Sequence, residues 1–111
     1  MQITFEIANE ALIIKLFGEL DHHSSDYIRE KIDAEIADKN FKKIIIDVGN
    51  LNFMDSSGIG VMIGRYKQIT SKGGKLAIAN LNPQIKRIYD VCGLKKIIPS
   101  YKTNEIAIER L

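Results

Sequence analysis

KIIIDVGNLNFMDSSGIGVMIGRYK, residues 43–67, is the stretch around which the rest of the chain is organised. The β-branched run Ile44–Ile46 predicts a strand over residues 43–48 that is buried on both faces. The last part repeats apolar residues at helical spacing and predicts an amphipathic helix, whose inner stripe is Ile59, Met62, Ile63, Tyr66 and Ile69. Asp55-Ser56-Ser57-Gly58 therefore lies where a strand gives way to a helix N-terminus, a place suited to negative charge.

The residues before this stretch predict an antiparallel hairpin. Apolar and polar residues alternate in a first strand with one face in water, the apolar ones being Ile3, Phe5 and Ile7. Asn9-Glu10 predicts a tight turn, and the mostly apolar Ala11–Phe17 predicts a more interior strand that pairs with the first. The chain is then expected to leave the sheet over Gly18–Asp21.

Three further helices are predicted. Asp21 or Ser24 can cap the first, which runs to about Asp38 with an inner face of Tyr27, Ile28, Ile32 and Ile36. Pro83 can sit in the first turn of the second, which Gly93 closes and whose inner stripe is Ile85, Ile88, Tyr89 and Cys92. Thr103–Leu111 predicts a short terminal helix.

The remaining segments complete an α/β pattern. Lys72-Gly73-Gly74 is a stop signal for the central helix, Lys75–Ala79 predicts a buried strand, and Ile97-Ile98 predicts a short edge strand. We expect a single domain over residues 1–111, with a mixed β-sheet built from the N-terminal hairpin and strand–helix units, right-handed crossovers and about four helices. Periodicity leaves open whether the helices cover one face of the sheet or both.

Composition narrows the classes of function. The net charge of +2 over 111 residues is no signature of nucleic-acid binding. The single cysteine, Cys92, excludes an internal disulfide and a cysteine-based metal cluster. No segment approaches the roughly 20 apolar residues of a membrane span. These features predict a monomeric, cytoplasmic protein that binds neither nucleic acid nor membrane.

Three kinds of enzymatic or metal site fit poorly. Neither Ser56 nor Ser57 has a glycine two residues before it, as a nucleophile elbow requires. Gly58 and Gly60 follow a strand, but Ile63 stands where the third glycine of a dinucleotide-binding loop belongs. The cluster Asp21-His22-His23 sits on one short turn, where neighbouring ligands rarely close a metal site. We therefore expect no catalytic activity, cofactor or metal.

A phosphorylation switch at the serines competes with a simple helix cap. Asp55, Ser56 or Ser57 can serve as the N-cap, and local chemistry alone favours that interpretation. However, three consecutive polar residues exceed what one cap needs. Glycines at 58, 60 and 64 cost the helix up to about 1 kcal/mol each relative to alanine. This open backbone patch either packs closely on the protein's own sheet or receives a partner.

The motifs of the chain resemble those of anti-sigma factor antagonists of the STAS class, most closely those that act in sporulation. The resemblance runs along the whole chain and is most specific in GELDHH at residues 18–23, FMDSSGIG at residues 53–60 and GRYKQI at residues 64–69. It implies a mixed sheet with helices, and it implies that Ser57, the second serine of the motif, is phosphorylated.

The same resemblance implies a set of partners. The kinase would be an ATP-using anti-sigma factor, which the unphosphorylated chain binds so that a sigma factor is released, and a serine phosphatase would reverse the modification. We ourselves predict that the helix face bearing Gly60, Val61 and Gly64, with Arg65 alongside, docks the partner. The full set of residues predicted in partner binding or support is Asp21, Asp55, Ser56, Gly58, Gly60, Val61, Gly64 and Arg65. The alternative is a STAS module that binds a small ligand or a nucleotide.

Overall fold

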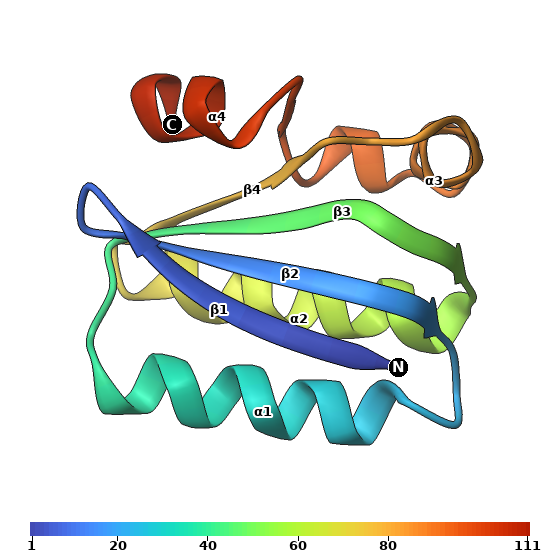
Figure 1. Cartoon of the computed structure of the whole chain (residues 1–111), viewed down its shortest axis with the longest axis horizontal. Helices are drawn as coiled ribbons and strands as arrows, with labels where there is room; N and C mark the ends of the chain where they lie inside the picture. Colours follow the sequence, from blue (N-terminus) through green and yellow to red (C-terminus); the bar gives the residue numbers. More distant parts are fainter.

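A computed structural model describes residues 1–111, and Figure 1 shows the whole chain. The elements in chain order are β1 (Gln2–Ala8), β2 (Ala11–Leu20), α1 (Ser25–Asp38), β3 (Lys43–Met54), α2 (Ser56–Ser71), β4 (Lys75–Ala79), α3 (Pro83–Val91), the 3₁₀ helix η1 (Leu94–Lys96), β5 (Ser100–Tyr101) and α4 (Asn104–Arg110). None of these helices is both long enough and apolar enough to span a membrane.

The sheet has five strands in the order β1-β2-β3-β4-β5. β1 and β2 are antiparallel, and every other neighbouring pair is parallel. Asn9 and Glu10 both have positive φ, 50° and 67°, as a tight two-residue hairpin turn requires. The predicted mixed sheet with an N-terminal hairpin is therefore confirmed.

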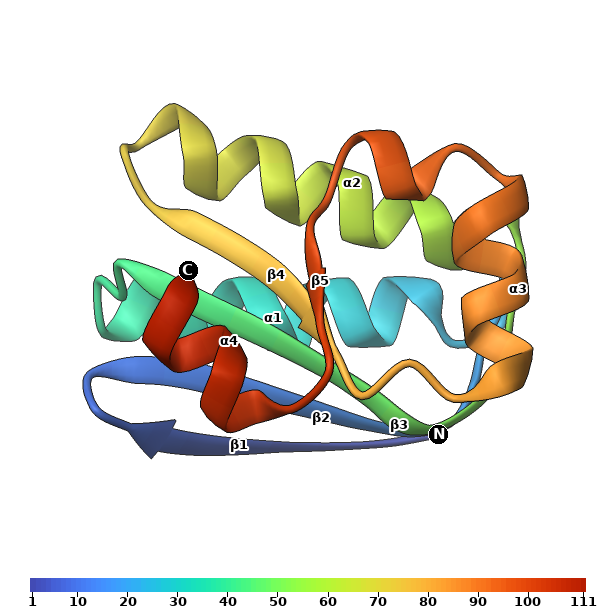
Figure 2. The same cartoon turned by 90° about the horizontal axis from the view of Figure 1, so that it is seen from above.

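Helices cover both faces of the sheet, which settles the question that periodicity left open. α1 and α2 lie on one face and α4 on the other (Figure 1), whereas α3 stands beside the end of the sheet where β3 leads into α2 (Figure 2). The main core of 21 buried residues joins the sheet to α1 and α2 and extends to α3 and η1. A small second cluster lies under α4 and consists of Ala11, Ile13, Ile45, Ala79 and Ala107.

β2 and β3 are longer than predicted. β2 does not leave the sheet over Gly18–Asp21 but continues to Leu20, and β3 runs past residue 48 to Met54. Irregularities in the β2–β3 register, one between Gly18 and Glu19, let the pairing continue. The side-chain amide of Asn82 also donates to the carbonyl oxygens of Val48, Gly49 and Leu51, so this polar segment keeps its carbonyls satisfied.

Four predictions of burial or local structure are wrong. Tyr27 lies beside the buried stripe of α1 and is 48% exposed, and Ile7 on the edge strand is 55% exposed. Cys92, predicted in the core, is exposed at the C-terminal cap of α3, beyond the last helical turn that faces the sheet. Ile97-Ile98 is no strand, because Gly93 at φ 88° turns the chain into η1 and delays the edge strand to β5.

Candidate functional site

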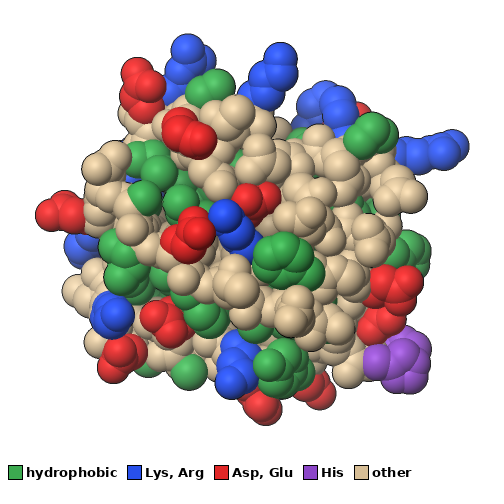
Figure 3. Space-filling model, in the orientation of Figure 1, with side chains coloured by type: hydrophobic (Ala, Val, Ile, Leu, Met, Phe, Trp, Pro, Cys, Tyr) green, Lys and Arg blue, Asp and Glu red, His purple; other side chains and the backbone are tan.

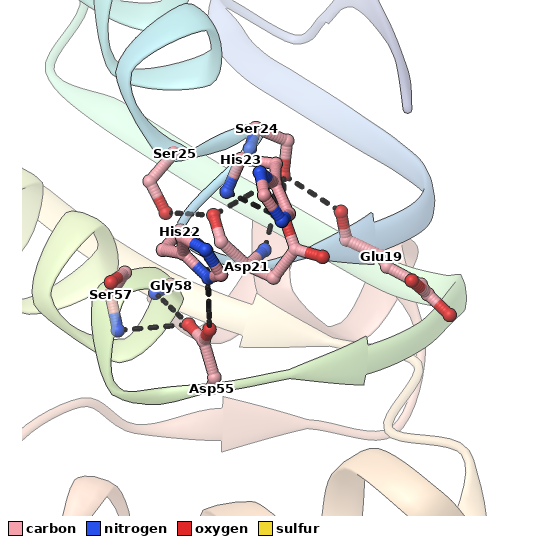
Figure 4. Close-up of polar contacts among 9 residues, drawn as sticks. All are labelled: Glu19, Asp21, His22, His23, Ser24, Ser25, Asp55, Ser57 and Gly58. Carbon is pink, nitrogen blue, oxygen red and sulfur yellow. Dashed lines mark hydrogen bonds and ion pairs between the residues drawn. The ribbon is translucent and has the colours of Figure 1, made fainter.

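Asp55 is the residue that caps α2. It directly follows β3, and its Oδ1 accepts hydrogen bonds from the backbone N–H groups of Ser57 at 2.9 Å and Gly58 at 3.1 Å (Figure 4). The first amides of the helix are therefore satisfied without a serine. The hydroxyl groups of Ser56, which is exposed, and Ser57, which is half-buried, make no hydrogen bond within the chain. Both hydroxyls are free for chemistry.

Gly58 has an internal role. A Cβ atom at this position would lie 2.3 Å from the carbonyl oxygen of Leu20 and 2.7 Å from Cγ of Met54. The absence of a side chain lets the first turn of α2 rest on the ends of β2 and β3. Of the two alternatives that the sequence left open for the glycines, Gly58 therefore follows the first, close packing on the protein's own sheet, because the space beside it is already filled.

The loop between β2 and α1 forms the other side of the site. Oδ1 of Asp21 accepts hydrogen bonds from the backbone N–H groups of His23 at 2.9 Å and Ser24 at 3.2 Å. Desolvation raises the pKa of Asp21, but these two hydrogen bonds, the charge of His23 and the Ser24 hydroxyl together hold that pKa below its usual value. The carboxylate of Asp21, a residue that we predicted in partner binding or support, thus shapes its own loop.

His22 is the residue of this loop that reaches the cap of α2. Its backbone N–H donates to Oδ2 of Asp55 at 3.1 Å, and its Nδ1 lies 3.8 Å from the same oxygen. Figure 4 shows the imidazole above the Asp55 carboxylate and Ser57 to the left of it, and Figure 3 shows histidine projecting from the surface. From the sequence we assigned no role to His22. The signal available there was its position beside Asp21 in a helix entry.

The predicted docking face of α2 is only partly available. A Cβ atom at Gly60 or Gly64 would meet nothing within 4 Å, so this strip of backbone is open. Val61, in contrast, is 7% exposed and belongs to the main core. The side chain of Arg65 is 13% exposed, and its Nε lies 3.1 Å from Oδ1 of Asp33 on α1. The side chains of Val61 and Arg65 are therefore not available to contact a partner, because both pack against the rest of the protein.

A family model described as the STAS domain matches residues 2–107. The chain belongs to the STAS family. This STAS domain is 44% identical over 111 residues to the anti-sigma F factor antagonist of Paenibacillus polymyxa, covering 100% of this chain and 95% of that protein. The anti-sigma factor antagonist SpoIIAA in its unphosphorylated form superposes with a TM-score of 0.75 at 32% identity, with 98% of this chain and 96% of that chain covered. The phosphorylated form of a Bacillus SpoIIAA gives a TM-score of 0.72 at 34% identity, covering 98% of each chain.

Proposed function

We propose that this STAS domain is an anti-sigma factor antagonist that phosphorylation of Ser57 switches off. The observation that carries the proposal is that the helix cap and the free hydroxyl at the start of α2 come from different residues. Asp55 caps the helix, and the Ser57 hydroxyl stands beside the helix N-terminus without a partner. Full-length similarity to an anti-sigma F factor antagonist supports the function, and the phosphorylated SpoIIAA structure supports the switch. The choice of Ser57 over Ser56 rests on the family resemblance.

The partners follow from this assignment. The unmodified domain binds an anti-sigma factor and releases the sigma factor for sporulation transcription. The anti-sigma factor uses ATP to phosphorylate Ser57, and a serine phosphatase restores the active form. The domain itself acts in the cytoplasm as a binding protein without catalytic activity.

Transfer of labelled phosphate tests the assignment. With a cognate anti-sigma kinase and radiolabelled ATP, we expect wild type and Ser56→Ala to take up label and Ser57→Ala to take up none. Mass spectrometry of the peptide that spans residues 55–58 would place the phosphate on Ser57. Label mainly on Ser56, or label incorporated without the kinase, would contradict the proposal.

A second prediction concerns the open strip of α2. Because the space beside Gly64 is empty, Gly64→Leu is expected to leave the free energy of unfolding within about 1 kcal/mol of wild type. Its side chain would stand between α2 and a docked partner, so affinity for the anti-sigma factor should fall at least about tenfold, or 1.4 kcal/mol. Titration calorimetry measures the affinity.

Thr70→Leu is the matched control for this surface. Thr70 is an exposed residue of the same helix, about one and a half turns beyond Gly64. We expect this variant to bind with wild-type affinity. Normal binding by Gly64→Leu would show that the partner does not cover this strip.

A further inference from the structure

His22 and Ser57 share one carboxylate. Oδ1 of Asp55 accepts from the Ser57 N–H at 2.9 Å, while Oδ2 faces both the backbone N–H of His22 at 3.1 Å and its Nδ1 at 3.8 Å. The backbone contact anchors the residue, and the imidazole is 68% exposed and free to turn. Among the side chains that can carry a positive charge, only that of His22 lies within 4.0 Å of an Asp55 carboxylate oxygen.

Phosphorylation of Ser57 is the largest change in charge that this site can undergo. It adds about −1.5 to −2 charges near pH 7 on the residue whose backbone N–H binds the Asp55 carboxylate. Two neighbouring anions repel, and both favour protonation of a base within reach. Histidine is the side chain that can supply the compensating positive charge near neutral pH, because it ordinarily titrates at about pH 6.5.

We propose that His22 is the counter-ion of phosphorylated Ser57, taking up a proton when the phosphate is added and lying between the phosphate and Asp55. This inference rests on the proposed function, since it concerns the phosphate that the function assigns to Ser57. His22 is a positioning residue. It orients the phosphate and offsets the repulsion from Asp55, so that the modified form keeps the α2 cap intact.

The other groups that face His22 have different tasks. The ring of His23 lies against that of His22, with a centroid distance of 3.9 Å and the two planes tilted by 39°. The Asp21 carboxylate accepts from the backbone N–H groups of His23 and Ser24. Neither His23 nor Asp21 contacts Asp55. His23 therefore serves as an internal reference. It lies in a similar electrostatic environment but makes no contact with the Asp55 carboxylate.

The proposal predicts a linked titration. Binding of a proton to His22 favours the fully ionised phosphate, and by reciprocity the phosphate must favour protonation of His22 by the same factor. An opposite charge within a few ångströms moves a titration midpoint by about one unit or more. For a shift of about one unit, His22 should bind at most about half a proton more in the phosphorylated domain than in the unmodified domain, at the pH midway between the two midpoints.

Nuclear magnetic resonance tests this coupling on protein with phosphoserine installed at position 57 by genetic code expansion. In that protein, the titration midpoint of the His22 Cε1–H resonance should lie about one pH unit higher than in the unmodified domain. The midpoint for His23 should rise by less than half as much. The phosphorus resonance should titrate at lower pH in the wild-type background than with His22→Gln, whereas His23→Gln should leave its midpoint near wild type.

Equal movement of the two histidines, or a phosphorus titration that His22→Gln leaves unchanged, would overturn the proposal. His22→Gln keeps the backbone N–H that donates to Asp55, so the loop contact survives in the variant. Because the phosphate is installed without a kinase, this result does not depend on the labelling experiment. Failure of kinase transfer with a normal histidine titration would count against the proposed function alone.

Discussion

Gly58→Ala is expected to destabilise the domain by more than about 2 kcal/mol, a large effect for a single methyl group. The added Cβ would lie 2.3 Å from the carbonyl oxygen of Leu20, which is backbone, and 2.7 Å from Cγ of Met54. A flexible side chain can turn aside, but the carbonyl of Leu20 is fixed by its strand. The first turn of α2 must therefore move away from the sheet, against a gain of at most about 1 kcal/mol from helix propensity.

Gly60→Ala provides a matched control in the same helix. A Cβ atom at that position meets nothing, so the substitution should stabilise the domain by about 0.5–1 kcal/mol through helix propensity alone. Urea unfolding of both variants measures the contrast. If Gly58→Ala were as stable as Gly60→Ala, the close packing of α2 on the ends of β2 and β3 would be wrong.

The central strand and helix were predictable because their apolar residues are strictly patterned. Ile44–Ile46 cannot lie anywhere but the interior, and Met62 and Ile69 mark the buried stripe of α2 as expected. The strand ends were not predictable in the same way. Gly49–Asn52, polar apart from Leu51, looks like a loop. It stays in the sheet because the distant Asn82 binds the carbonyls of Val48, Gly49 and Leu51.

The sequence predicted where the site lies but not which residues contact one another within it. The motif placed Asp55 and Ser57 at a helix start, but three residues could equally supply the cap until hydrogen-bond geometry chose Asp55. The role of Gly58 stayed open between internal packing and partner docking because the sequence does not show that Leu20 lies against it. The contact of His22 with Asp55 joins residues 33 positions apart, and no local pattern encodes such a contact.

The largest expected effect on binding comes from a negative charge at position 57. Ser57→Asp should leave the free energy of unfolding within about 1 kcal/mol of wild type, because a charge at a helix N-terminus gains roughly 0.3–1 kcal/mol and repulsion from Asp55 offsets part of it. The Ser57 hydroxyl has no partner within the chain, so its replacement breaks no internal hydrogen bond. The fold therefore has no reason to rearrange.

Affinity for the anti-sigma factor should respond quite differently. A charge that is unmatched at a docked interface costs several kcal/mol in desolvation, and about 2.7 kcal/mol already lowers affinity a hundredfold. We therefore expect Ser57→Asp to bind at least a hundredfold more weakly than wild type, and Ser57→Ala to bind normally and never be switched off. Titration calorimetry measures both, and Ser56→Asp adds the same charge on the neighbouring exposed residue as a control.

Switching by direct exclusion also makes a spectroscopic prediction. Amide shifts caused by phosphorylation of Ser57 should be confined to the β2–α1 loop and to residues 53–60, which surround Asp55. The parallel pairing of β3 with β4 lies at the far end of β3, where Lys43–Asp47 align with Lys75–Ala79, and its shifts should not change. Shifts spread over that pairing would mean that the phosphate acts through a global rearrangement, and the exclusion mechanism would then be wrong.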